Sequence, residues 1–187
     1  MAFIVVYEAN VLVPARLRDM VMRIAESGIV RARWSDDILD EWRRALTRRF
    51  PELKGDQLRR YRSAMVNAVP DCLVSNYQGL GADLDLVDEA DRHVVAAAIR
   101  AQAQLIVTYN LRHFPEHALA KYDIEVKHPD EFVLDAIDLY SGRVSSMIQQ
   151  MSDNLRNPAQ TVDQVLATLQ GHQLTQSVAK LREQVGD

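Results

Sequence analysis

The chain has 187 residues, 48% of them hydrophobic, which is enough to bury one substantial core but too few for two full domains. The single cysteine, Cys72, excludes an internal disulfide framework and a cysteine-based zinc site, and it fits a reducing cytoplasm. The net charge of −4 argues against a broad, nonspecific nucleic-acid binder, because such proteins carry a strong basic excess.

The sequence also argues against export and against a membrane location. The apolar run at residues 2–7 is too short for the core of a signal peptide and lacks a basic leader. No apolar stretch approaches the roughly 20 residues that a membrane helix requires. We therefore interpret the first run as a buried strand and expect a cytoplasmic protein with no membrane partner.

Five short apolar runs, rich in β-branched and aromatic residues, are candidate strands buried on both faces. They cover residues 3–7, 29–34, 72–75, 105–108 and 124–126. Helix-like segments alternate with them, and such alternation indicates βαβ units and a mostly parallel sheet. We predict an α/β fold: a three-layer α/β/α domain with a roughly five-stranded sheet over residues 1–130.

Residues 131–187 are predicted to form a C-terminal helical extension. Residues 144–155 carry apolar side chains spaced for one helix face. Asn157 and Pro158 suit an N-cap and a first helical position, and Gly171 suits a helix end. A second stripe follows, made of Leu174, Val178, Leu181 and Val185. The resulting hairpin must bury its stripe against the main domain, against a partner protein or against a second copy.

Charge is distributed unevenly along the chain. Residues 40–62 contain eight basic residues against four acids, whereas residues 83–91 contain five acids and no base. The first region could hold phosphates and the second could hold cations. The alternative is that the arginines simply solvate the outer faces of two helices.

Four polar residues lie at positions where the predicted fold could bind a ligand. Glu8 and Asn110 follow the C-terminal ends of two predicted parallel strands, where open α/β sheets place their ligands. Glu41 borders the buried stripe of a helix opened by Ser35, and Asp91 lies near the start of another helix. Hard cations such as Mg²⁺ or Mn²⁺ take oxygen ligands of this kind. The joint placement favours a shared cation site, although each residue alone could be a cap, a turn residue or an ion-pair partner.

Other chemistry is less well supported by the sequence. The five histidines show no ligand spacing on a common helix face, so we interpret them as surface residues. No glycine-rich phosphate loop and no nucleophile elbow is present. Trp34 and Trp42 could stack on bases, but their positions favour the core.

Taken in chain order, four segments resemble the PIN-domain family from about residue 2 to residue 130. They are Val-Tyr-Glu-Ala-Asn-Val-Leu, Trp-Ser-Asp-Asp-Ile-Leu-Asp-Glu-Trp, Asp-Glu-Ala-Asp-Arg-His-Val-Val-Ala-Ala-Ala and Ile-Val-Thr-Tyr-Asn-Leu-Arg-His-Phe. The C-terminal segment resembles that of some VapC-type toxins. The resemblance implies a metal-dependent ribonuclease that acts as the toxin of a toxin–antitoxin pair, with RNA as substrate and a cognate antitoxin as partner.

The resemblance also implies a set of site residues. The catalytic positions are Glu8, Glu41, Asp91 and Asn110, and the first three of these would bind Mg²⁺ or Mn²⁺. Supporting positions are Asn10, Asp88 and Thr108. For contacts with RNA phosphates we select four arginines: Arg16, Arg44, Arg48 and Arg112.

Two positions depart from the family pattern. The family often has aspartate where this chain has Asn110, whose amide oxygen can still accept a hydrogen bond from metal-bound water. The family has aspartate where this chain has Glu8, which keeps the charge but adds one methylene, and sites tolerate misplacement of only about 0.5 Å. We therefore expect a natural or engineered variant with attenuated activity.

Two alternatives belong to other functional classes. The first is a catalytically silent module that binds RNA or an antitoxin because Glu8 has spoiled the metal site. The second is a receiver-like phosphoacceptor domain, which would need a lysine across the pocket. The lysines before residue 130 are Lys54, Lys121 and Lys127, and the last two flank the presumed edge strand, so this alternative is disfavoured. The oligomeric state stays open, with a homodimer among the options.

Overall fold

The computed structural model describes residues 2–80, 84 and 88–185. Five parallel strands form one sheet in the order β3-β2-β1-β4-β5, which confirms the predicted α/β architecture. The strands are β1 (Phe3–Tyr7), β2 (Val30–Ser35), β3 (Leu73–Val74), β4 (Leu105–Val107) and β5 (Glu125–Lys127). Because all pairings are parallel, the carboxyl ends of the strands share one edge of the sheet.

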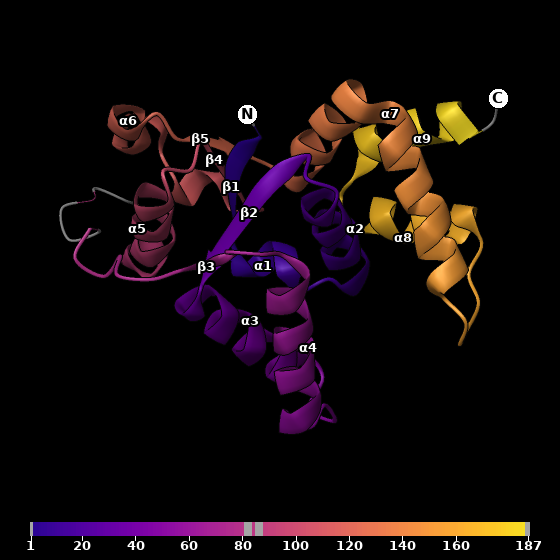
Figure 1. The fold of residues 1–187 in the computed structure, drawn as a ribbon, viewed down its shortest axis with the longest axis horizontal. Helices are drawn as coiled ribbons and strands as arrows, with labels where there is room; N and C mark the ends of the chain where they lie inside the picture. Colours follow the sequence, from indigo (N-terminus) through magenta and orange to yellow (C-terminus); the bar gives the residue numbers. More distant parts are fainter. Residues whose placement is uncertain (1, 81–83, 85–87, 186–187) are drawn as a thin grey trace.

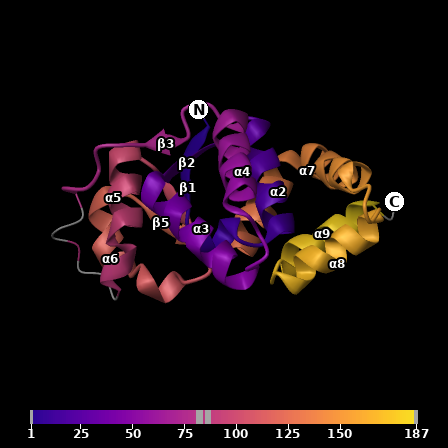
Figure 2. The same ribbon diagram turned by 90° about the horizontal axis from the view of Figure 1, so that it is seen from below.

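Helices cover both faces of this sheet, as Figures 1 and 2 show for α5 on one side and α2 on the other. The N-terminal helices are α1 (Ala9–Leu12), α2 (Ala15–Glu26), α3 (Asp36–Arg49) and α4 (Gly55–Ala68). They are followed by α5 (Arg92–Ala101), α6 (Glu116–Leu119), α7 (Pro129–Asn154), α8 (Val162–Gly171) and α9 (Thr175–Val185). Short 3₁₀ turns occur at Glu89–Asp91, Leu111–His113 and Ala120–Tyr122. No helix in these ranges is long and apolar enough to cross a membrane.

Helix α3 begins where the sequence predicts it. The Ser35 hydroxyl accepts a hydrogen bond from the Ile38 backbone amide at 3.2 Å. Two aspartates occupy the first turn, where their negative charge interacts favourably with the helix dipole. Both tryptophans are fully buried, as predicted, and the Trp42 indole donates to the Leu12 carbonyl at 3.0 Å. This packing fixes α3, and with it Glu41, against the sheet.

The C-terminal helices differ from prediction at one boundary. Helix α8 begins after Thr161, because Thr161 and Gln164 cap each other's backbone amides reciprocally. Asn157 and Pro158 lie in the preceding loop, where Arg156 and Ala159 pair across a turn, so the predicted N-cap is wrong. Gly171 does end α8, as predicted.

The two apolar stripes of the extension are buried. The α7 stripe consists of Val144, Met147, Ile148 and Met151, and the α9 stripe begins with Leu174, Val178 and Leu181. The side chain of Val185 lies outside the described part of the chain. The α8–α9 hairpin packs on α7, and α8 also contacts α2, so the stripe is covered by the chain itself.

A buried carboxylate anchors this hairpin. Asp130, in the first turn of α7 and 5% exposed, accepts hydrogen bonds from the amides of Gln176 and Ser177, both at 2.9 Å. The Ser177 hydroxyl donates in turn to the Asp130 carbonyl at 2.8 Å. The N-terminus of α9 is therefore capped from the start of α7, close to the predicted domain boundary at residue 130.

Candidate active site

Glu8 lies at the carboxyl edge of the sheet, directly after β1. Its carboxylate is nearly buried, at 5% exposure, and accepts hydrogen bonds from the Thr108 hydroxyl and from the Asn10 amide, the latter at 2.9 Å. The parallel register of β1 and β4 places Tyr7 opposite Val107, so the next residues of the two strands, Glu8 and Thr108, are neighbours. The predicted supporting roles of Asn10 and Thr108 therefore correspond to direct contacts with Glu8.

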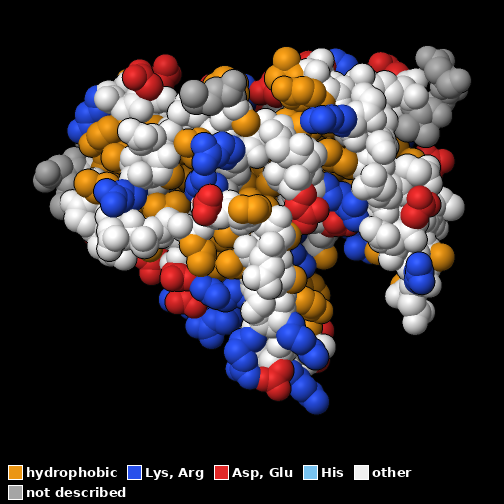
Figure 3. Space-filling model, viewed as in Figure 1, with side chains coloured by type: hydrophobic (Ala, Val, Ile, Leu, Met, Phe, Trp, Pro, Cys, Tyr) orange, Lys and Arg blue, Asp and Glu red, His pale blue; other side chains and the backbone are white. Residues whose placement is uncertain are grey.

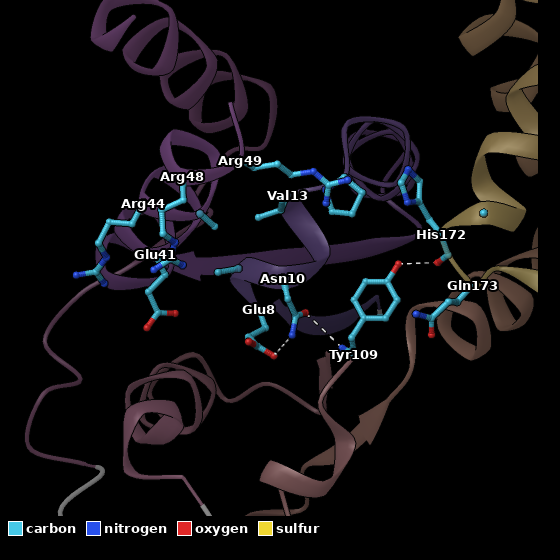
Figure 4. A pocket seen from close by; sticks show the side chains of 14 residues that line it. Glu8, Asn10, Val13, Glu41, Arg44, Arg48, Arg49, Tyr109, His172 and Gln173 are labelled. Atoms are coloured by element: carbon cyan, nitrogen blue, oxygen red, sulfur yellow. Dashed lines mark hydrogen bonds between the residues drawn. The ribbon is translucent and has the colours of Figure 1, made fainter. Parts of the chain in front are cut away.

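The negative charges of three carboxylates act on one another at this edge. Burial, assisted by the negative charges of Asp91 and Glu41, raises the pKa of Glu8 from its ordinary 4.5 to about 7, although the hydrogen bonds from Thr108 and Asn10 lower it. Burial also raises the pKa of Asp91, with Asp88 and Glu41 adding to the effect. Figure 4 shows Glu8 and Glu41 pointing into the same space. Glu8 and Glu41 therefore lie together, and Asp91 is close enough for its charge to act on Glu8.

Two histidines contact these acids, which the sequence analysis missed by treating them as surface residues. His113 Nδ1 lies 2.7 Å from an Asp91 carboxylate oxygen, and His93 Nε2 lies 3.0 Å from a Glu41 carboxylate oxygen. Burial lowers the pKa of His93, but Glu41 and the other nearby acids outweigh this effect and raise it overall. Both rings contact acids that are distant in the sequence, so no spacing along one helix could have indicated them.

Asn110 and Asp88 are placed less directly. The Asn110 backbone amide donates to the Thr108 hydroxyl at 2.9 Å, but its side chain is exposed and makes no hydrogen bond with the acids among the described contacts. Asp88 caps a 3₁₀ turn by accepting from the Ala90 amide at 2.9 Å. It also lies with Asp91 and His113 in a group whose potential ligand atoms are all within 4.8 Å of one another.

A cleft of about 660 Å³ is lined by Glu8 and Glu41, whereas Asp91 lies outside its lining. Two of the arginines selected from the sequence, Arg44 and Arg48, line it from α3, and Arg49 lies beside them. The C-terminal part of the chain contributes Gly171, His172 and Gln173 to the same cleft, which the sequence did not indicate.

The other two selected arginines do not line this cleft. Arg16 faces the loop before α8, where its Nε donates to the Gln160 side chain at 3.3 Å. Arg112 is exposed in the 3₁₀ turn after Asn110. Their position along the sequence near the strand ends did not fix the direction of their side chains.

The donor set suits a hard divalent cation. Glu8 and Glu41 offer carboxylate oxygens to the cleft and Asp91 lies nearby. Carboxylate oxygen is the ligand type that Mg²⁺ and Mn²⁺ prefer. The described hydrogen-bond partners of Glu8 are neutral, and no basic side chain in the described ranges forms an ion pair with it. A cation in the cleft would therefore offset a charge that the protein leaves nearly buried.

The chain belongs to the PIN-domain family, whose model matches residues 4–112. A second model, described as the VapC50 C-terminal domain, matches residues 129–183. The chain is also 47% identical over 92 residues to a protein of Mycobacterium tuberculosis (strain ATCC 25618 / H37Rv) named "Putative ribonuclease VapC50". This match covers 49% of the chain and 54% of that protein, so the chain spans about half the length of the curated relative it matches. No solved structure matched the chain.

The matches confirm both parts of the resemblance. Three of the four segments lie within the PIN match, which ends two residues before the end of the fourth, and the second match covers most of the predicted helical extension. The chain is therefore a VapC-type PIN protein that carries a C-terminal helical extension.

Proposed function

We propose that this chain is a divalent-metal-dependent endoribonuclease and the toxin of a toxin–antitoxin pair. The observation that carries the proposal is the nearly buried Glu8, which shares a cleft with Glu41 and is close enough to Asp91 for its charge to act on Glu8. Family membership and the ribonuclease named among its relatives support the choice of RNA as substrate.

Glu8, Glu41 and Asp91 would hold Mg²⁺ or Mn²⁺. Such an ion supplies a hydroxide nucleophile at neutral pH and offsets the charge that grows on the reacting phosphate. The chain's own groups orient the ligands: Asn10 and Thr108 hold the Glu8 carboxylate, while His93 and His113 contact the other two acids.

The arginines of α3 would bind the RNA backbone. Arg44 and Arg48 line the cleft from the same helix as Glu41, one turn apart, which suits contacts with phosphates close to the reacting one. Figure 3 shows Lys and Arg side chains gathered over α3 and α4, so the basic surface continues outward from the cleft. Asn110 would act at the rim of the site rather than as a direct partner of the acids.

Glu8 would attenuate the enzyme. Its carboxylate accepts hydrogen bonds from Asn10 and Thr108. Because glutamate has one methylene more than aspartate, its carboxylate oxygens would lie further into the cleft than those of an aspartate. A displacement of about 1 Å at a reacting centre can cost on the order of a hundredfold in rate.

Partners, organisation and location follow from the same proposal. The chain would act in the cytoplasm and be neutralised by a cognate antitoxin protein, while its oligomeric state stays open, with a homodimer among the options. Residues 1–130 would form the catalytic domain and residues 131–187 its helical extension.

RNA cleavage by the purified chain tests this function. We expect cleavage of RNA in Mg²⁺ or Mn²⁺ and none in EDTA, with loss of cleavage in Asp91→Asn. Expression of the natural chain should slow bacterial growth, and expression of Asp91→Asn should not. RNA that binds but is not cut under any metal condition would instead support the silent RNA-binding module.

A further inference from the structure

The turn between α8 and α9 forms part of the cleft that contains the acids. Gly171, His172 and Gln173 line the same cavity as Glu8 and Glu41, although they lie far beyond the PIN match, which ends at residue 112. Figure 4 shows His172 and Gln173 on one side of the cleft and Arg44, Arg48 and Glu41 on the other, with Arg49 reaching between them. The C-terminal extension therefore borders the site rather than packing only on the outer helices.

The Tyr109 hydroxyl connects this turn to the edge of the sheet where Glu8 lies. Tyr109 Oη donates to the His172 carbonyl at 2.7 Å, and the Tyr109 amide donates to the Asn10 side chain at 3.3 Å. The Tyr109 ring also packs edge-on against His128, with ring centroids 5.0 Å apart. Because Asn10 in turn binds Glu8, a continuous set of contacts joins the turn to the buried carboxylate.

The turn is also fixed from its far side. The Asp130 carboxylate binds the amides of Gln176 and Ser177 at the start of α9, three residues beyond the cleft-lining Gln173. A segment held at both ends in this way is rigid enough to position a ligand, because little conformational entropy is left to lose on binding.

The two sides of the cleft differ in chemistry. Helix α3 presents Arg44, Arg48 and Arg49, which suit phosphates. The turn presents the exposed Gln173 amide, which can both donate and accept, and the His172 ring, whose pKa is lowered by burial and by Arg49. Amides and neutral aromatic rings are the groups that read and stack unpaired RNA bases.

We propose that the α8–α9 turn is the base-side wall of the substrate cleft, where His172 and Gln173 contact an unpaired nucleotide beside the scissile phosphate of single-stranded RNA. Tyr109 is a positioning residue that holds this wall through the His172 carbonyl. The inference rests on the proposed ribonuclease function and adds a substrate class and a source of base preference to it.

Steady-state cleavage of single-stranded RNA oligonucleotides, varied one base at a time around the cut, tests the inference. Gln173→Ala and His172→Ala should each raise KM for the preferred RNA about tenfold and weaken base preference, since a base contact contributes about 1–3 kcal/mol. The value of kcat should stay within about twofold, because the acids are untouched. Tyr109→Phe keeps the ring and should raise KM in the same direction. Gln176→Ala, a matched change on the exposed face of the same hairpin, should alter neither constant.

Binding of the same labelled RNA in EDTA, measured by fluorescence anisotropy, separates this inference from the proposed function. Cleavage with unchanged KM and base preference in both Gln173→Ala and His172→Ala would overturn the inference and leave the function standing. A second outcome is that Gln173→Ala weakens RNA binding although the natural chain cuts no RNA in Mg²⁺ or Mn²⁺. This outcome would support the inference and contradict the function. An RNA that is neither bound nor cut would overturn both.

Discussion

At the scale of single residues, Glu8 combines burial with two nearby negative charges. Its pKa of about 7 means that the folded, metal-free protein favours the protonated carboxyl well above the ordinary value of 4.5. Since the folded pKa exceeds the unfolded one, the stabilising contribution of this group is complete below about pH 4.5 and is lost as pH rises through 7.

The first prediction concerns metal-free stability. A rise of this size corresponds to about 3 kcal/mol, so Glu8→Gln should be more stable than the natural chain above pH 7 by an amount of that order. The two forms should converge as pH falls toward 4.5. Urea unfolding in EDTA across this pH range measures the difference. A difference that does not change with pH would mean that the Glu8 carboxylate is not destabilised by its surroundings.

The second prediction concerns activity at the same position. Glu8→Asp should cut RNA faster, by up to about a hundredfold if the shorter side chain removes a displacement of about 1 Å. Manganese should partly rescue the glutamate form through its looser geometry. Rates should be compared on one RNA across Mg²⁺ and Mn²⁺ concentrations. Equal rates for the two forms would show that the cleft accommodates glutamate natively and would end the attenuation proposal.

Sequence reasoning selected the acids of the candidate site but not the histidines that contact two of them. Glu8, Glu41 and Asp91 were indicated because each is tied to a local element: a strand end, a helix stripe and a helix start. His93 contacts Glu41 and His113 contacts Asp91 only when distant segments of the chain meet. No local sequence pattern could therefore have indicated these histidines. The same limit explains why Arg16 was selected although its side chain turns toward Gln160.

At the scale of elements, local signals predicted the starts of some helices and not of others. The Ser35 cap of α3 was predicted because a side-chain acceptor is followed by two aspartates. The start of α8 was misplaced because Asn157 and Pro158 gave a similar local signal, while the reciprocal cap between Thr161 and Gln164 lies four residues later. Local capping rules rank such sites poorly when two lie close together.

The third prediction tests the anchor of the C-terminal hairpin. Asp130→Asn keeps one acceptor but turns the other into a donor facing an amide of α9, so it should lower the free energy of unfolding by about 2–3 kcal/mol. Urea unfolding gives this value. The matched control is Asp135→Asn on the same helix, whose exposed pair with Lys127 should contribute at most about 1 kcal/mol. Equal losses in the two variants would contradict the anchoring role of Asp130.

At the scale of the whole molecule, the net charge of −4 conceals a division between basic and acidic surfaces. The basic side chains gather over α3 and α4 (Figure 3). Glu8 and Glu41 line the cleft from the end of β1 and from α3, and Asp91 lies directly before α5. Such a division lets a weakly acidic protein hold RNA phosphates beside a cation site.

The fourth prediction follows from this division. Binding of single-stranded RNA should weaken with salt, and the double variant Arg44→Gln/Arg48→Gln should reduce the slope of log Kd against log salt by about 0.7 for each phosphate contact removed. Arg100→Gln, on the exposed part of α5 outside the cleft, is the control and should keep the full slope. A double variant with the slope of the control would show that α3 does not bind the RNA backbone.

The architecture was predictable at this scale because βαβ alternation repeats along the chain, and the five strands were found where short apolar runs occur. The entry of the C-terminal turn into the cleft was not predictable. His172 and Gln173 reach it through the packing of α8 and α9 on α7 and α2, which depends on helix crossing geometry rather than on any motif.

Anomalous diffraction from crystals of the full chain soaked in Mn²⁺ tests the central claim most directly. The account predicts a manganese peak in the cleft, contacted by the carboxylates of Glu8 and Asp91 with Glu41 beside them, and loss of this peak in Asp91→Asn. A peak confined to Asp88 and His113 would contradict the account. The absence of a peak in the cleft would also contradict it if the crystallised protein still cuts RNA.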